Sequence, residues 1–342
     1  MGISEILGLL GGLALFLHGM QMMSSGLEAA AGARMKSILE RLTANRFLGV
    51  LVGAAITAVI QSSSATTVMV VGFVNAGMMT LGQAVWIIMG ANIGTTVTGL
   101  LIALDVGELA PMFAFVGVVL MVFIKEPKLQ HIGQILAGLG VLFIGMGMMS
   151  SSMSPLRDSE PFIRIMSTFS NPLLGILAGA AFTAVIQSSS ASVGILQALA
   201  SSGVISYASS VFVLFGQNIG TCITAVLAAI GTNRNAKRAT LIHLMFNLIG
   251  TAIFTTLFVL FPIAAVVEGT LVLPGEVGRT LSHLIPTDPM AQIAMTHTVF
   301  NITTTLVLLP LGNYLAKLAI RILPDQAVET EDQESMTLAY LT

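Results

Sequence analysis

The composition of this chain excludes a soluble globular protein. Of its 342 residues, 55% are hydrophobic and only 9% are charged, whereas charged residues make up about 25% of soluble domains. The formal net charge of -2 provides no basic surface for nucleic acid, and a single cysteine, Cys222, excludes a disulfide framework. The sequence therefore predicts an all-α polytopic membrane protein.

Apolar segments long enough to cross the membrane are spread along the whole chain. Crossing about 30 Å of hydrocarbon takes about 20 helical residues. The first segment reads as a span rather than a removed signal, because it has no basic leader and its pattern returns later in the chain. The predicted spans are residues 4–26, 81–104, 109–124, 131–153, 207–230, 238–262 and 290–316.

Two further apolar stretches, at about residues 47–80 and 173–206, have a different form. As single helices they would be about 51 Å long, which is too long for one span. Each is interrupted by the sequence Gln-Ser-Ser-Ser, and each side of the interruption is short for a full crossing. We therefore expect two re-entrant helical hairpins. Their breaks should face the protein interior, because irregular backbone at membrane depth must be buried in protein or line a wet cavity.

Segments of the first half return in the second half at a constant offset of 126 residues, which indicates two related units. The matches are residues 49–66 with 175–192 at 14 of 18 positions, 90–98 with 216–224 at six of nine, and 12–25 with 138–151 at eight of 14.

The units are predicted at residues 1–126, with a span, an interfacial helix, a hairpin and two spans, and at 127–262. An additional C-terminal span at 263–323 and an acidic, disordered tail at 324–342 follow. Because three crossings form one unit, the second unit is expected to be inverted.

Charge sets the expected orientation. Eleven Lys and Arg residues fall on one side of the predicted spans and three on the other, so the first side is cytoplasmic by the positive-inside rule. The C-terminus is then inside and the N-terminus outside, in the inner membrane. A topology in which each hairpin spans once gives the same count, so the inversion depends on segment length. Residues 27–46 and 158–170 are expected to be amphipathic interfacial helices.

The two hairpin breaks are the first candidate site. Gln61 to Ala65 and Gln187 to Ala191 are identical in sequence, and each break ends one short helix and starts another. A starting helix presents free N–H groups that suit an anion, and a finishing helix presents carbonyl oxygens that suit Na⁺. Inverted repeats with discontinuous helices are typical of ion-coupled secondary transporters. The alternative is that these serines only help helices to pack.

Two other patterns repeat. Gly-x-Asn-Ile-Gly-Thr occurs at residues 90–95 and 216–221. The glycines permit unwinding, so each unit is expected to contain a broken transmembrane helix; the alternative is that they only allow close helix packing. His-x-x-Phe-Asn occurs at residues 243–247 and 297–301. This second motif is either part of a site or a set of hydrogen bonds between helices, and the sequence leaves that open.

Missing residue types narrow the function further. No carboxylate, Lys or Arg lies in the middle of a span, which argues against a proton relay and requires that cations balance the charge of a bound anion. No nucleotide-binding motif occurs. A serine hydrolase using His243 or His297 fits two symmetric serine runs poorly, so an enzyme is not expected.

At these motifs the chain resembles the type II sodium-dependent phosphate cotransporters, in their bacterial form, over about residues 1–320. The resemblance implies Na⁺-driven import of inorganic phosphate by alternating access. Phosphate would lie between the two serine runs and near two asparagines: Ser62, Ser63, Ser64, Ser188, Ser189, Ser190, Asn92 and Asn218. The implied Na⁺ ligands are Gln187, Ser188, Thr221 and Thr224, with Gln61, Ser62, Thr95 and Thr98 as their counterparts.

This chain departs from the family pattern at two positions. Gln217 stands where a small residue is usual, but it still offers an oxygen and is included among the Na⁺ ligands; Cys222 replaces the second threonine of its motif. The expected partners are phosphate, Na⁺ and the lipid bilayer, with no organic cofactor, and a homodimer is left open. The alternatives are Na⁺-coupled transport of sulfate or a small carboxylate, and a passive anion channel.

Overall fold

The computed structural model describes residues 2–31, 45–104, 106–271 and 274–325, and within these ranges every regular element is a helix. In the first half these are α1 (Ile3–Ala31), α3 (Arg46–Ile60), α4 (Ser63–Asn75), α5 (Leu81–Ile102) and α6 (Ala110–Phe123). The second half holds α7 (Pro127–Met153), α8 (Glu160–Thr168), α9 (Pro172–Ile186), α10 (Ser189–Ser201), α11 (Tyr207–Gly220), α12 (Cys222–Ala228) and α13 (Arg234–Leu260). The C-terminal helices are α14 (Ile263–Val267), α15 (Gly275–Leu284), α16 (Pro289–Leu308) and α17 (Gly312–Ile322).

Five of the predicted spans are confirmed as long apolar helical segments. They are Ile3–Ala30, Leu81–Ile102, Pro127–Asp158, Tyr207–Ala228 and Arg234–Leu260. The predicted span at 109–124 is a shorter apolar segment, Gly107–Phe123. The predicted span at 290–316 is not one straight helix, because the chain bends by 82° between α16 and α17. Pro310 lies at this bend, where its missing N–H removes a helical hydrogen bond.

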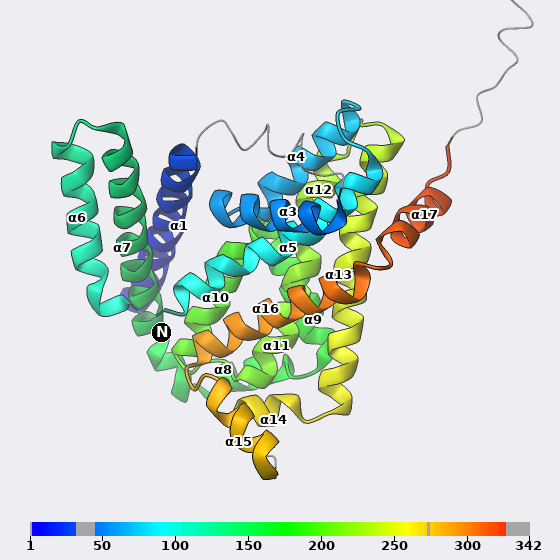
Figure 1. Cartoon of the computed structure of the whole chain (residues 1–342). Coiled ribbons are helices and arrows are strands. Elements are labelled where there is room, and N and C mark those ends of the chain that lie inside the picture. The colour runs from blue at the N-terminus through cyan, green and yellow to red at the C-terminus, as the bar shows by residue number, and fades with distance from the viewer. Residues whose placement is uncertain (1, 32–44, 105, 272–273, 326–342) are drawn as a thin grey trace, which may run out of the picture.

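The helices form two groups. One group, at one side of the molecule, consists of α1, α6 and α7 (Figure 1). The larger group contains α5, α11, α13 and α16 together with the helices on either side of the two Gln-Ser-Ser-Ser breaks, α3 with α4 and α9 with α10. Close approach of glycines holds α1 against α7. A Cβ atom on Gly12 would lie 2.7 Å from the carbonyl oxygen of Gly145, and one on Gly19 would lie 2.7 Å from that of Gly138. Because the earlier residue of α1 meets the later residue of α7, the two helices are antiparallel.

The expectation of a broken spanning helix in each unit is wrong for the first unit, since α5 runs without interruption from Leu81 to Ile102. Its glycines serve close packing instead of unwinding: a Cβ on Gly90 would lie 2.0 Å from the carbonyl oxygen of Val50 in α3. The equivalent Gly216 packs against Ile176 of α9 at the same separation, 2.0 Å. In the second unit the helix is interrupted only at Thr221, between α11 and α12.

The two expected interfacial helices have different outcomes. Most of residues 27–46 lies outside the described residues, and the described part up to Ala31 continues α1. In the second unit, α8 is a short helix with no buried residue, and the chain bends by 96° between it and α9. The predicted tail falls almost wholly outside the described residues, which end at residue 325.

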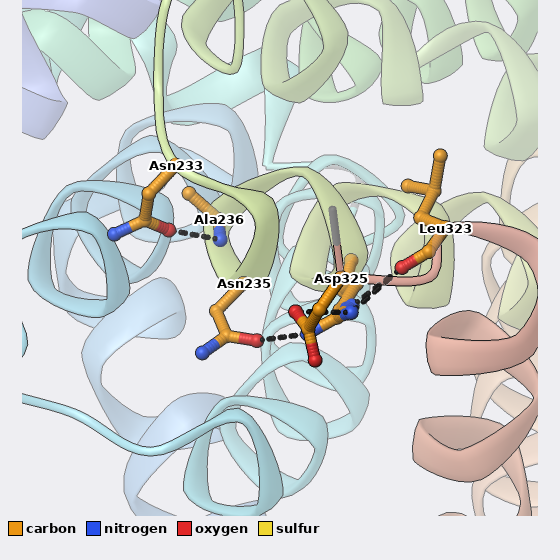
Figure 2. A network of polar contacts seen from close by, with 6 residues as sticks. Asn233, Asn235, Ala236, Leu323 and Asp325 are labelled. Atoms are coloured by element: carbon orange, nitrogen blue, oxygen red, sulfur yellow. Dashed lines mark hydrogen bonds and ion pairs between the residues drawn. The ribbon is translucent and has the colours of Figure 1, made fainter. Parts of the chain in front are cut away.

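A buried arginine ties the end of α17 to the start of α13. Arg238 is 3% exposed, and its Nε and Nη2 donate to the carbonyl oxygen of Leu323 at 2.9 and 2.7 Å. Nη2 also pairs with Asp325 at 2.8 Å, and Nη1 donates to Asn235 at 2.7 Å. Figure 2 shows this network beside the N-terminal cap of α13, where the Asn233 side chain accepts from Ala236 N at 2.9 Å.

Candidate functional site

The breaks between α3 and α4 and between α9 and α10 have the same unusual backbone. Gln61 (φ 56°, ψ 25°) ends α3 and Gln187 (φ 60°, ψ 20°) ends α9, both in the left-handed region. They are the only non-glycine residues with positive φ among the described residues. Such conformations cost on the order of 1 kcal/mol or more and persist only where the surroundings hold them. The fold therefore maintains both breaks against a local preference for continuous helix.

A serine starts the next helix at each break. The Ser62 hydroxyl accepts from Ala65 N at 3.1 Å and the Ser188 hydroxyl accepts from Ala191 N at 3.2 Å. This is the usual N-terminal cap of a helix. Because one cap bond uses only one lone pair of each hydroxyl oxygen, Ser62 and Ser188 keep an acceptor free for another ligand.

The two tips touch each other. The hydroxyl oxygens of Ser63 and Ser189 are 3.2 Å apart. Beside them, Ser64 donates to the carbonyl oxygen of Gln187 at 3.4 Å, and Ser190 donates to that of Gln61 at 3.5 Å. Each contact has its counterpart at the 126-residue offset, which is the reciprocal pattern of a two-fold relation. The serines predicted from sequence are thus brought together at one place.

Helix α5 adds a polar group to this junction. The Thr98 hydroxyl is buried, with the residue 1% exposed; it donates to Gln61 Oε1 at 2.8 Å and lies 3.1 Å from Ser190 Oγ. The other predicted residues of α5 bond within their own helix: Thr95 donates to the carbonyl oxygen of Ala91 at 2.9 Å, and Asn92 donates to that of Ile88 at 2.8 Å. In the first unit, therefore, Gln61 and Thr98 share one cluster, whereas Asn92 and Thr95 stay on the helix behind it.

The second unit is more open. Gln187 is exposed, whereas its counterpart Gln61 is 6% exposed. Thr224 donates to the carbonyl oxygen of Thr221 at 3.0 Å rather than to Gln187. Asn218 donates to the carbonyl oxygen of Leu214 at 3.1 Å and contacts the His297 ring at 3.2 Å through its Oδ1 atom. The structure does not gather the second set of expected ligands as closely as the first.

Several buried oxygens of the second unit lack a hydrogen-bond partner. They include Gln217 Oε1 and Thr221 Oγ1, which belong to the predicted Na⁺ set, and Thr183 Oγ1 and Ser192 Oγ, which sequence reasoning missed. Gln217 Nε2 donates to the carbonyl oxygen of Ser192 at 3.0 Å, so at least these two residues are neighbours. A buried oxygen left unpaired costs about 1 to 3 kcal/mol. A small cation would remove that cost, because such ions take several oxygen ligands.

The counterparts of the two missed residues show what differs between the units. Thr57 and Thr66 correspond to Thr183 and Ser192 at the 126-residue offset, and their hydroxyls bond each other at 2.9 Å. The repeated segment contains both pairs, so the repeat itself was the signal that could have identified them. Groups of three or more His, Cys, Asp or Glu side chains able to hold a metal are absent from the part of the chain that the structure describes. A cation here would have only neutral oxygens as ligands.

Comparisons with known proteins agree on one family. The family model described as Na⁺/Pi-cotransporter matches residues 15–151 and 159–273. The chain is 31% identical over 316 residues to the uncharacterised protein YqeW of Bacillus subtilis, which covers 90% of this chain and 95% of YqeW. It is 27% identical over 323 residues to YjbB of Escherichia coli, a protein named for inorganic phosphate export, which covers 94% of this chain.

The match to YjbB spans only 56% of that protein's length. Human sodium-dependent phosphate transport protein 2B is 36% identical over 110 residues, which is 31% of this chain and 16% of that protein. No solved structure matches the chain.

Proposed function

Because the chain belongs to the Na⁺/Pi-cotransporter family, we propose that it is a secondary transporter that imports inorganic phosphate with Na⁺ by alternating access. The meeting of the two serine tips, with Ser63 and Ser189 at 3.2 Å, is the observation that carries the proposal. It joins two helix N-termini and two sets of hydroxyls at one point. The family is one of transporters, so catalysis is not part of the proposal.

Contacts between α1 and α7 support the inversion of the two units. Gly12 approaches Gly145, and Gly19 approaches Gly138. At the 126-residue offset Gly138 is the counterpart of Gly12 and Gly145 is the counterpart of Gly19, so replacing each residue by its counterpart turns one contact into the other. A two-fold relation produces this exchange. Since the two helices are antiparallel, the two-fold axis is perpendicular to them. For helices that cross the membrane, such an axis lies in the membrane plane, as in transporters built from inverted repeats.

Phosphate is proposed to bind between the two serine runs, where it would replace the contact between Ser63 and Ser189. The first turns of α4 and α10 then offer backbone N–H groups and positive helix ends. The hydroxyls of residues 62–64 and 188–190 offer further donors, and Asn92 and Asn218 stand on the helices behind. No positive side chain contributes to the contacts at these tips. Co-bound Na⁺ is therefore required to balance the anion.

The proposed Na⁺ site of the second unit uses Gln187, Ser188, Gln217, Thr221 and Thr224. Its support is the buried, unpaired oxygens of Gln217 and Thr221. Thr183 and Ser192 join this set for the same reason.

The counterpart set of the first unit is Gln61, Ser62, Thr95 and Thr98. There the contacts of Thr98 with Gln61 and Ser190 satisfy the oxygens that would otherwise bind an ion. The two sets are therefore proposed to be in different states.

The proposal is tested by uptake of labelled phosphate into proteoliposomes containing the purified protein. We expect saturable uptake that needs an inward Na⁺ gradient, and equal uptake with K⁺ in place of Na⁺ would contradict the coupling. Excess sulfate or a small carboxylate should compete poorly; strong competition would favour the alternative substrates. Non-saturating flux without Na⁺ would indicate a passive channel.

Direction is tested with membrane vesicles of known sidedness. The name of YjbB makes efflux the alternative to import. We propose that the C-terminus is on the cytoplasmic side of the inner membrane and the N-terminus outside. A protease-sensitive tag at each end of the chain, probed in right-side-out and inverted vesicles, would establish the orientation. Uptake in each type of vesicle then gives the direction.

A further inference from the structure

The repeated His-x-x-Phe-Asn motif is the feature that the proposed function does not use. Its copies lie on α13, with His243 and Asn247, and on α16, with His297 and Asn301, at an offset of 54 residues. Both asparagines make the same bond, donating to the carbonyl oxygen of the histidine one turn earlier at 3.0 and 2.9 Å. All four residues are at most 1% exposed.

α13 and α16 correspond to each other in the same way as α5 and α11: the two-fold relation that places α5 on α11 also places α16 on α13. On α13, Thr251 donates to the carbonyl oxygen of Phe215 in α11 at 3.2 Å. On α16, Thr305 donates to that of Met89 in α5 at 3.5 Å. Phe215 is Met89 plus 126, and Thr305 is Thr251 plus 54. The C-terminal helix α16 therefore pairs with α13 and is not an additional span outside the symmetry.

The crossing point of the two helices agrees with this pairing. An added Cβ atom on Gly250 of α13 would lie 2.7 Å from the hydroxyl of Thr304 on α16. Thr304 is Gly250 plus 54, so counterparts meet here, as expected on a two-fold axis.

The same relation predicts a contact that the structure lacks. His297 Nε2 lies 3.2 Å from Asn218 Oδ1, and the counterpart of this pair is His243 with Asn92. Both ring nitrogens of His243 are buried without a partner. A buried imidazole with two unpaired nitrogens is costly, so an alternative partner in another conformation would explain its presence.

Two other counterpart pairs differ in the same way. Thr57 bonds Thr66, but Thr183 and Ser192 have no partner. Thr98 bonds Gln61, whereas the equivalent contact between Thr224 and Gln187 is replaced by a bond to the carbonyl oxygen of Thr221. The two repeat units of this structure thus have different conformations.

We propose that His243 and His297 are alternating positioning residues. His297 holds Asn218 in the state described, and His243 holds Asn92 when the two units exchange conformations. This inference rests on the alternating access of the proposed function. Because one histidine is paired and one is unpaired in either state, the cost of the unpaired ring is equal in both and does not favour one state. Two states of similar free energy are what a reversible exchange requires.

The test measures the population of the two states with single cysteine probes. Ala65 is exposed, and its counterpart Ala191 is 0% exposed. Each is changed to cysteine in a Cys222→Thr background, which copies the residue of the first unit, Thr96. Labelling by a membrane-impermeant maleimide is followed at both probes.

We expect His297→Ala to raise labelling of the Ala191→Cys probe and lower that of the Ala65→Cys probe, and His243→Ala to do the opposite. The size should be about fivefold, the effect of one net hydrogen bond on a two-state ratio. His243→Gln and His297→Gln, which keep a donor and an acceptor, should restore the labelling of the unsubstituted protein.

Labelling shifts in the same direction for both alanine variants, or no shift, would overturn the inference. Loosened packing alone would not change the labelling in opposite directions in the two variants. Uptake by the protein with both histidines is measured in parallel. Opposite shifts without Na⁺-driven phosphate uptake would contradict the proposed function alone. Normal uptake with shifts of equal sign would contradict the histidine assignment alone.

Discussion

At the scale of single residues, the unpaired oxygens of the second unit are the observation that most directly supports the proposed Na⁺ site. Thr221 Oγ1 is buried without a partner, and its counterpart Thr95 donates to the carbonyl oxygen of Ala91 at 2.9 Å. Two residues of one type in equivalent places are thus satisfied in one unit and unsatisfied in the other. Burial of an unpaired hydroxyl is tolerated where function requires it.

Replacing Thr221 by valine separates stability from ion binding. Thr221→Val removes an unpaired hydroxyl at almost constant volume, so the melting temperature without Na⁺ should stay equal or rise slightly. The stabilisation by added Na⁺, which depends on the ratio of ion concentration to Kd, should fall, with Kd raised about tenfold or more. Thermal unfolding in a Na⁺ series measures both quantities.

Ser209→Ala is the matched control, since Ser209 is 2% exposed and lies in α11, the helix that ends at Thr221, but outside both repeated motifs. It should leave the Na⁺ dependence unchanged. Equal loss of Na⁺ dependence in both variants would mean that Thr221 only packs the helix.

At the scale of helices, glycine contacts position the site. α5 lies against α3 through Gly90 and Gly94, and α11 lies against α9 through Gly216 and Gly220. The sequence motif containing these glycines could be found from the repeat, but two physical roles were open for it. Whether a glycine allows two helix backbones to approach closely can be decided only when the facing carbonyl, such as that of Val50, is located. That is why the sequence alone could not exclude unwinding of α5.

Adding one methyl group to α5 should separate it from α3. The Cβ of Gly90→Ala would lie 2.0 Å from the carbonyl oxygen of Val50, which requires backbone movement, so we expect a destabilisation of about 1 to 3 kcal/mol and weaker transport. Gly72→Ala is the control, because nothing lies within 4 Å of the added atom. It should stabilise α4 by up to about 1 kcal/mol. Thermal unfolding of the two variants is compared, and equal melting temperatures would contradict the packing role.

The connection of α17 to α13 depends on the buried arginine more than on its ion pair. The Asp325 side chain is 78% exposed and that of Arg238 is 4% exposed. Asp325→Ala should therefore cost less than about 1 kcal/mol. Arg238→Ala leaves the Leu323 and Asn235 bonds unmade and should cost about 2 kcal/mol. Thermal unfolding at low and high salt tests this order; a larger effect of Asp325→Ala would reverse the assignment.

At the scale of the whole molecule, the sequence predicted which residues of the two units correspond, but it did not predict the arrangement of the C-terminal helices. The 126-residue offset predicted which serines would be counterparts, because 14 of 18 positions match. The pairing of α13 with α16 was not predicted, since only four of nine positions match between residues 243–251 and 297–305. The sharp bend after α16 was missed as well, because apolar composition continues through Pro310 and hides the turn.

The contact between the two serine tips can be tested by cross-linking. The hydroxyl oxygens of Ser63 and Ser189 are 3.2 Å apart, so cysteines at these positions can approach disulfide geometry, with an S–S bond of about 2.05 Å. We expect Ser63→Cys with Ser189→Cys, in the Cys222→Thr background, to cross-link under mild oxidation. Phosphate with Na⁺ should slow the cross-linking, because the anion is proposed to occupy the space between these side chains. Phosphate with K⁺ should not slow it.

The matched control is Ser64→Cys with Ser190→Cys, whose hydroxyls contact the opposite backbone rather than each other. This pair should cross-link more slowly. Electrophoresis after protease cleavage between the units measures the linked fraction. Cross-linking at a rate that neither phosphate nor Na⁺ changes would show that the tips meet without a ligand between them, and it would remove the central support for transport at this junction.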